Sequence, residues 1–299
     1  SGDLDVNDGT IKLDGNYPTG TDNTALGDEA LATVEVGGNY NTAIGNDSLK
    51  DLTTGDKNTA IGRLAGANTT TASNNTILGA DAFFTNTTGG DNTAVGTGSL
   101  NSNTTASNNT AVGYQAGYAN TTGTQNVAVG QAALKANTTA NNNTSVGQES
   151  SQATTTGASN TVVGRAAFYT NTTGASNVAV GDSALLNNTT ASRNSAVGYQ
   201  SSYSNTTGSA NASLGYQALY TNTTGAENTA MGDQALYLNT TGAGVTGLGR
   251  FALYANTTGN YNTAVGLQSL ANNTTASENT AVGYQSLYGN TTGGANTSM

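Results

Sequence analysis

Three short patterns in the sequence carry residue types found in binding or catalytic sites. Gly242, Gly244 and Gly247 have the spacing of the dinucleotide-binding fingerprint, whose glycines let the backbone approach a pyrophosphate. That fingerprint needs a strand before it, a helix after it and an acidic residue about 20 positions further on. Here the glycines fall on positions of a regular repeat, so a degenerate repeat unit is favoured over a cofactor site.

Alternating acidic residues at the start of the chain have the outline of a calcium loop. Asp3, Asp5, Asn7 and Asp14 follow the spacing of oxygen ligands in such loops. However, Asp8 stands where the sharp turn of the loop needs glycine, and Asp14 replaces the bidentate glutamate. An acidic surface segment is the favoured interpretation, and a calcium site at this junction is the alternative.

The adjacent carboxylates Asp28 and Glu29 are the candidates for acid–base chemistry. Other repeats have Tyr-Gln, Arg-Leu or Gln-Ala at this place, so a solvated turn is favoured. The chain has no His and no Cys, which excludes an imidazole base, a thiol nucleophile and the soft metal ligands. We therefore predict that the chain is not an enzyme and uses no cofactor.

Tyrosines recur at fixed intervals and are the candidates for binding a surface. Tyr203, Tyr220, Tyr237 and Tyr254 are each separated by 17 residues. A strip of stacked rings would bind glycans or a host surface. The favoured interpretation is that the strip is buried between chains of an oligomer or covers an edge of the fold.

These residues belong to a 17-residue repeat, which is the dominant signal in the sequence. Its unit reads Asn-Thr-Ala-Val-Gly-Tyr-Gln-Ala-Leu-Tyr-x-Asn-Thr-Thr-Gly-x-x. A glycine that follows an aliphatic residue or Met recurs sixteen times, at intervals of 17 after one first step of 18. These repeat glycines are Gly27, Gly45, Gly62, Gly79, Gly96, Gly113, Gly130, Gly147, Gly164, Gly181, Gly198, Gly215, Gly232, Gly249, Gly266 and Gly283.

The repeat predicts an all-β fold, a parallel β-solenoid of about sixteen 17-residue coils. Such a unit is too short for a helix pair and too long for one strand, and it suits two short strands joined by two turns. Asn-Thr-Ala-Val-Gly has the character of the first strand, and Ala-Leu-Tyr-x-Asn-Thr-Thr is expected to form the second. Because stacked coils lie about 4.8 Å apart, side chains at one repeat position should form a column.

Columns of Asn, Gly and aliphatic residues are predicted to hold the stack together. An Asn amide can donate to one neighbouring copy and accept from the other. The aliphatic residue before each glycine and the Leu or Phe four residues after it should form a thin core, which favours association of several chains. The predicted structural ladders contain Asn41, Asn58, Asn75, Asn92, Asn109, Gly45, Gly62, Gly79, Gly96, Gly113, Val95, Val112 and Val129; a second asparagine column contains Asn120, Asn137, Asn171 and Asn188.

The composition restricts both fold and partners. The 299 residues include 41 Asn and 54 Thr, and only 9% are charged, against about a quarter in a typical globular domain. The net charge is −10 without a basic stripe, so nucleic-acid binding is not expected. There is no run of about 18 apolar residues, so no membrane insertion is expected. We assign residues 1–20 to an acidic connecting or capping segment and residues 21–299 to the repeat region.

The Asn-Thr-Ala-Val-Gly motif, once per coil, resembles the head repeats of trimeric autotransporter adhesins, which have a similar Asn-Ser-x-Ala-Ile-Gly signature. The opening segment 8–18, running into the repeats, is similar to marine bacteriophage tail-fibre proteins. The Asn-Thr-Thr-Gly unit is also similar to repeats that precede a self-cleaving intramolecular chaperone in such fibres. The resemblance covers about residues 9–299 and implies a left-handed β-roll in a homotrimer, although the period of 17 is slightly longer than that of the adhesin heads.

Two hypotheses of function follow from the repeat and the resemblance. The favoured one is the structural shaft of an extracellular fibre, on a virion tail or a cell surface. Its partners would be two further copies of the chain, other fibre or virion proteins at its ends, and a host cell-surface glycan. The alternative is an ice-binding or glycan-binding solenoid with columns from pairs such as Thr104 and Thr105, although adjacent strand residues point to opposite faces. The chain lacks an initial Met, so either processing has removed it or the chain is a segment of a longer protein. The C-terminal end of the repeats has no evident cap, which also suggests a segment.

Overall fold

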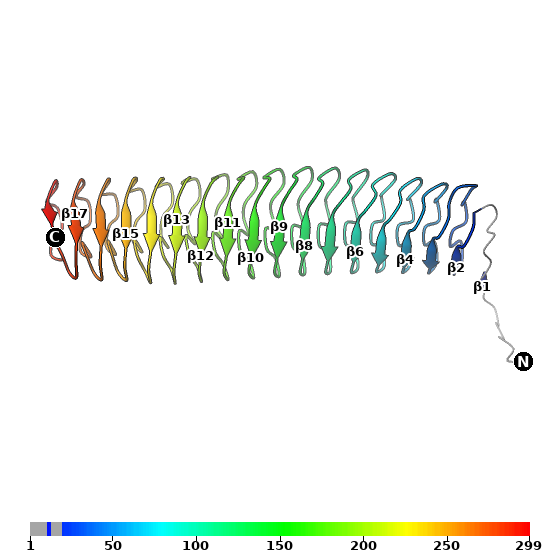
Figure 1. Ribbon diagram of the computed structural model, residues 1–299, viewed down its shortest axis with the longest axis horizontal. Coiled ribbons are helices and arrows are strands. Elements are labelled where there is room, and N and C mark those ends of the chain that lie inside the picture. Colours follow the sequence, from blue (N-terminus) through cyan, green and yellow to red (C-terminus); the bar gives the residue numbers. More distant parts are fainter. Residues whose placement is uncertain (1–10, 13–19) are drawn as a thin grey trace, which may run out of the picture. The chain divides into compact units, whose positions relative to one another are not determined.

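The computed structural model describes residues 11–12 and 20–299. They form an all-β parallel solenoid of about sixteen coils, and no helix occurs in these residues. Each coil contributes one short strand, and the strands of successive coils lie side by side (Figure 1). The chain divides into two compact units, Ser1–Asn142 and Asn143–Met299.

In the first unit the strands of successive coils pair in parallel and in register, so that Thr93 lies opposite Thr110 and Val95 opposite Val112. A short additional strand, β1, pairs antiparallel with β2 and places Ile11 opposite Leu26. It therefore covers the free edge of the first coil. The rest of the predicted acidic segment, including the calcium-loop pattern, lies outside the described residues. The strands are β1 (Ile11–Lys12), β2 (Thr24–Leu26), β3 (Thr42–Ile44), β4 (Thr59–Ile61), β5 (Thr76–Leu78), β6 (Thr93–Val95), β7 (Thr110–Val112) and β8 (Val127–Val129).

The second unit repeats the same arrangement. Its strands also pair in parallel and in register, with Val163 opposite Val180 and Val265 opposite Val282. Since equivalent residues face each other, every repeat position forms a column within the unit. The strands are β9 (Thr144–Val146), β10 (Thr161–Val163), β11 (Val178–Val180), β12 (Ser195–Val197), β13 (Ala212–Leu214), β14 (Thr229–Met231), β15 (Thr246–Leu248), β16 (Thr263–Val265), β17 (Thr280–Val282) and β18 (Thr297–Ser298).

The prediction of a second strand in each coil is wrong for the described coils. Residues 114–119, which include the first four residues of one such segment at 116–122, form turns. Gln115, two residues after its repeat glycine, has φ 53°. Leu134, four residues after the repeat glycine of the next coil, has φ 51°. These left-handed residues bend the chain, so the alternation of an extended strand cannot continue. Backbone bonds between coils persist nevertheless, as in the Leu100 N–H that donates to Ala116 O at 3.0 Å.

A narrow column of Leu and Phe, four residues after the repeat glycine, forms the centre of the core. Most of these side chains are completely buried and lie against buried Ala or Ser from the same coils. A left-handed backbone costs an L-residue about 1–2 kcal/mol. Full burial of a Leu or Phe side chain contributes about 1.5–3 kcal/mol and offsets that cost. The largest members are Leu31, Leu49, Phe83, Leu100 and Leu134 in the first unit and Phe168, Leu185, Leu219, Leu236, Leu253 and Leu270 in the second.

The aliphatic residue before each repeat glycine faces outward, contrary to the prediction that it lies in the core. Val112 is 36% exposed and Leu78 46% exposed, whereas Ala111 is fully buried. Adjacent strand residues point to opposite faces, so only one of Ala111 and Val112 can point into the coil. The leucine column leaves room there for the smaller side chain, alanine. We call these outward residues the outer aliphatic stripe. It comprises Leu26, Ile44, Ile61, Leu78, Val95, Val112 and Val129 in the first unit and Val146, Val163, Val180, Val197, Leu214, Met231, Leu248, Val265 and Val282 in the second.

Candidate functional site

The predicted glycine column ends each strand at a point where consecutive coils leave no room for a side chain. Gly45, Gly62, Gly79, Gly96 and Gly113 have φ between +123° and +143°. A Cβ atom on any of them would lie 2.5–2.7 Å from the carbonyl group of the next repeat glycine. This column therefore sets how closely the coils stack.

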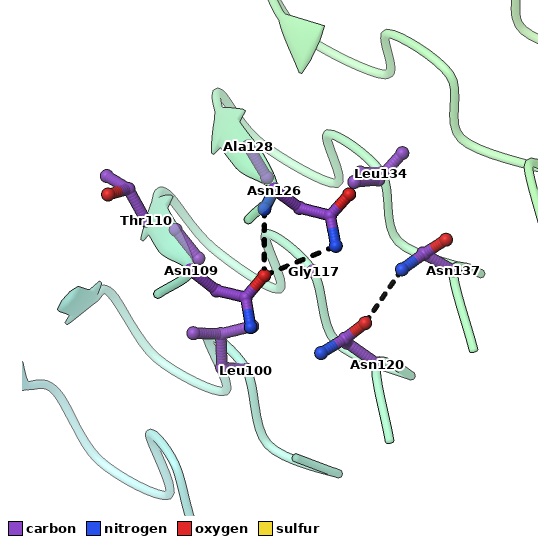
Figure 2. Close-up of a pocket in the computed structure, with 10 residues that line it drawn as sticks. Leu100, Asn109, Thr110, Gly117, Asn120, Asn126, Ala128, Leu134 and Asn137 are labelled. Carbon is purple, nitrogen blue, oxygen red and sulfur yellow. Dashed lines mark hydrogen bonds between the residues drawn. The ribbon is translucent and has the colours of Figure 1, made fainter. Parts of the chain in front are cut away.

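The predicted asparagine ladder lies inside the coils and is hydrogen-bonded throughout. Asn58 Nδ2 donates to Asn41 Oδ1 at 3.1 Å and to Ala72 O at 2.9 Å. Figure 2 shows the same pattern further along, where the backbone N–H and the Nδ2 of Asn126 both donate to Asn109 Oδ1, at 2.9 and 3.2 Å. We call this column the strand asparagines; its predicted members Asn41, Asn58, Asn75, Asn92 and Asn109 are at most 1% exposed.

The second asparagine column follows the leucine column and is also buried. In the first unit Asn137 Nδ2 donates to Asn120 Oδ1 at 2.7 Å, as Figure 2 shows. In the second unit Asn188 Nδ2 donates to Asn171 Oδ1 at 3.1 Å. The two asparagine columns satisfy polar groups inside coils that have little apolar volume.

The threonine pairs of the repeat do not form a double array of exposed hydroxyls. Thr121, the first of its pair, is half-buried, and its Oγ1 donates to Thr138 O at 2.9 Å. Thr122, the second, is exposed. Each pair therefore adds one exposed column rather than two, which weakens the basis of the ice-binding alternative.

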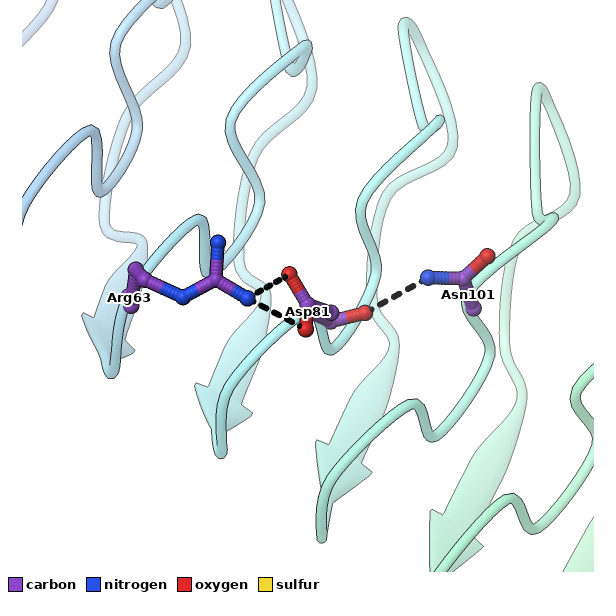
Figure 3. Close-up of polar contacts among 3 residues, drawn as sticks. All are labelled: Arg63, Asp81 and Asn101. Carbon is purple, nitrogen blue, oxygen red and sulfur yellow. Dashed lines mark hydrogen bonds and ion pairs between the residues drawn. The ribbon is translucent and has the colours of Figure 1, made fainter.

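Charged side chains lie on the turns and pair between coils. Arg63 Nη2 contacts both carboxylate oxygens of Asp81 at 2.9 and 2.8 Å, and Asn101 Nδ2 donates to the backbone O of Asp81 at 2.8 Å (Figure 3). Glu29, from the predicted carboxylate pair, forms an ion pair with Lys50, and this contact raises the pKa of Lys50. These are exposed pairs, which contribute little to stability.

The dinucleotide-like glycines do not form a phosphate loop. Gly244 has φ 65° in a turn, and Gly247 is the central residue of β15. No helix follows them in residues 248–299. The pattern is a repeat unit in which Val245 and Gly247 replace the usual Asn and Ala.

Four tyrosines form one continuous stack in the second unit, which we call the tyrosine ladder. The ring centroids of Tyr203 and Tyr220 lie 5.1 Å apart, those of Tyr220 and Tyr237 5.1 Å, and those of Tyr237 and Tyr254 5.3 Å. Neighbouring planes differ by at most 12°. Burial in the stack raises the pKa of the Tyr220 hydroxyl, and the adjacent tyrosines add to this effect. The ladder is half-exposed and offers ring edges to solvent.

A glutamine column beside the tyrosine ladder was not recognised from the sequence. Gln217 Nε2 donates to Gln200 Oε1 at 2.9 Å, and Gln234 Nε2 donates to Gln217 Oε1 at 3.0 Å. The sequence pattern that could have predicted this column is the recurrence of Gln two residues after the repeat glycine. Other repeats have different residues at that position.

Within the described part of the chain, no helix has the length and apolar character needed to cross a bilayer. The same residues contain no cluster of three or more His, Cys, Asp or Glu placed to hold a metal ion. No protein-family model matches the chain, and no curated protein matches it in a sequence search.

Proposed function

We propose that this chain is the structural shaft of an extracellular homotrimeric fibre, a phage tail fibre or a surface adhesin, that supports attachment to a host or surface. The observation that carries the proposal is the outer aliphatic stripe. Strands β2 to β18 contain no charged residue, while the charged residues after residue 20 lie on turns and connections. A contiguous exposed apolar patch marks an interaction surface, so an aliphatic stripe without charges suits an interface.

The narrow core gives a physical reason for association. In most coils the large buried side chain belongs to the leucine column, and the aliphatic side chain before the repeat glycine is left outside. Stripe members such as Leu214, at 51% exposed, and Met231, at 43%, would be covered by stripes from two other copies. Burial of such side chains contributes about 25 cal/mol per Å² of apolar surface.

The hydrogen-bonded columns suit a role in which force passes along the stack. Successive coils are tied together by backbone bonds and threonine hydroxyls, and by strand asparagines except where Val245 replaces one. In this proposal the coils are left-handed, the ends join other fibre or virion proteins, and turns that differ between repeats meet the host glycan.

Charge placed in the outer aliphatic stripe should dissociate the fibre. In the double variant Val112→Lys and Val163→Lys, each unit would bury an unpaired ammonium, which costs several kcal/mol per site. We expect the mass from sedimentation equilibrium to fall to that of one chain, 29.7 kDa, while the far-UV circular dichroism spectrum is retained.

The matched control places the same charge on an exposed column away from the stripe. The double variant Thr122→Lys and Thr173→Lys should keep the wild-type mass, because both residues are exposed and lie outside the strands. A Val112→Lys and Val163→Lys protein with the wild-type mass would show that the stripe is not the interface.

A further inference from the structure

One ring is missing from the column that the tyrosine ladder occupies. Ala271 stands in the coil after Tyr254, and Tyr288 stands in the coil after Ala271. Two coil steps of about 4.8 Å therefore separate the positions of Tyr254 and Tyr288. Ladder rings repeat at 5.1–5.3 Å, so the gap at Ala271 has room for one ring. Ala271 itself is 6% exposed and forms the floor.

The neighbouring glutamine column is interrupted at the same place. Gln234 Nε2 donates to Gln217 Oε1 at 3.0 Å, and Gln285 Nε2 donates to Gln268 Oε1 at 2.9 Å. Between them Phe251 replaces glutamine. Among the described residues, no donor reaches Gln234 Oε1 and no acceptor reaches Gln268 Nε2. An amide acceptor and an amide donor are therefore left for a ligand or for water.

The two interruptions lie beside one groove of about 240 Å³ that is open to solvent. Tyr254 and Tyr288 line it together with Ala271, and Gln234 and Gln268 line it with their amides. The ring of Phe251 meets Tyr254 edge-on at 5.5 Å between centroids.

The groove has no net charge to attract an ionic ligand. Arg250 lies over the Phe251 ring, with its Cζ 4.4 Å from the centroid, and is paired with Asp233 at 3.4 Å. The groove itself is lined by aromatic rings, amides and Ala271. This combination fits a neutral ligand with apolar faces and hydrogen-bonding edges.

We propose that this groove binds one pyranose ring of an uncharged glycan, held between Tyr254 and Tyr288 and oriented by the amides of Gln234 and Gln268. A pyranose presents C–H groups to an aromatic ring on each face, and its equatorial hydroxyls both donate and accept. A purely aromatic ligand would fill the gap but would leave both amides unused. The site rests on the glycan contact of the proposed function and gives that contact a place and a ligand class. It is formed within one chain, so it does not depend on the number of chains.

The test is a titration of the full chain with the methyl pyranosides of glucose, galactose, mannose and N-acetylglucosamine, followed by saturation-transfer-difference NMR. We expect at least one to bind with Kd near 1 mM, a free energy of about −4 kcal/mol, with transfer concentrated on the ring C–H protons. Ala271→Tyr supplies the missing ring and should weaken binding at least tenfold without lowering the unfolding midpoint. Tyr288→Ala should weaken binding similarly.

Leu186→Tyr is the matched control, since Leu186 occupies the same repeat position between Tyr169 and Tyr203. It should bind as the wild type does. The proposal is overturned if none of the four pyranosides binds, or if Ala271→Tyr binds them unchanged. It is also overturned if p-cresol, an aromatic probe, binds at this groove and the pyranosides do not. A failure of the shaft proposal appears separately, in the mass of the chain.

Discussion

Substituting Gly113 with alanine should lower the free energy of unfolding by roughly 2–6 kcal/mol, the sum of backbone strain and overpacking. Gly113 has φ +137°, a conformation that L-residues rarely adopt. Its new Cβ would lie 2.5 Å from Gly130 O and 2.6 Å from Gly130 C, so the two coils must move apart. Urea unfolding gives the loss of stability, and hydrogen exchange of β6 to β8 shows whether it is centred on this contact.

Substitutions of two other glycines distinguish the cost of backbone strain from the cost of overpacking at Gly113. Gly98 has φ +66° but its Cβ would meet only side-chain atoms at 3.6 Å, so Gly98→Ala should cost about 1–2 kcal/mol of left-handed strain alone. Gly289 has no atom within 4 Å of its Cβ position, so Gly289→Ala should change stability by less than about 0.5 kcal/mol. If Gly113→Ala were no worse than Gly98→Ala, the glycine column would not set the coil spacing.

Truncation of one strand asparagine should have an effect of comparable size. Asn109→Ala removes the donor to Gly123 O, at 2.9 Å, and the acceptor for the Asn126 N–H, at 2.9 Å. Each buried group left without a partner costs about 1–3 kcal/mol, so the expected loss is about 2–6 kcal/mol. Urea unfolding measures this loss. A change below about 0.5 kcal/mol would contradict a structural role of the ladder.

The substitution Asn109→Asp should make the stability of the fold decrease as the pH rises. Position 109 is 1% exposed, and the carboxylate would face the carbonyl of Gly123, so its pKa in the folded chain should rise above the ordinary value near 3.9. Stability is then highest below that ordinary pKa, where both states are protonated. It falls as the pH rises and the unfolded chain ionises. The exposed neighbour provides the control: Asn108→Asp should show no such fall.

The stacking of the coils and the columns of equivalent residues were predictable from the repeat. A fixed period with an obligate glycine and two asparagine positions admits few arrangements other than stacked coils. Asn41 and Asn58 differ by one repeat, so their position on adjacent coils followed directly from the period. The tyrosine ladder followed in the same way from Tyr203 and Tyr220.

The conformation inside each coil was not predictable from the same pattern. Alternation shows that Ala111 and Val112 lie on opposite faces, but it does not show which face is inside. That choice depends on the space left by the leucine column, a property of the closed coil. The turns at Gln115 and Leu134 could not be predicted from the residue types, because neither residue favours a left-handed backbone. Burial of the leucine column compensates for the strain of this conformation. The groove depends on which residues stand in adjacent coils, and appears only when Phe251 and Ala271 are seen together.

The most direct test of the proposed fibre is the native mass of the unmodified chain, measured by sedimentation equilibrium at several concentrations. The outer aliphatic stripe should hold three copies together, so we expect a mass near three times 29.7 kDa that does not change with concentration. A mass of 29.7 kDa at every concentration would contradict the trimeric shaft. The stripe would then be free in solution, and thermal hysteresis would be the next property to measure.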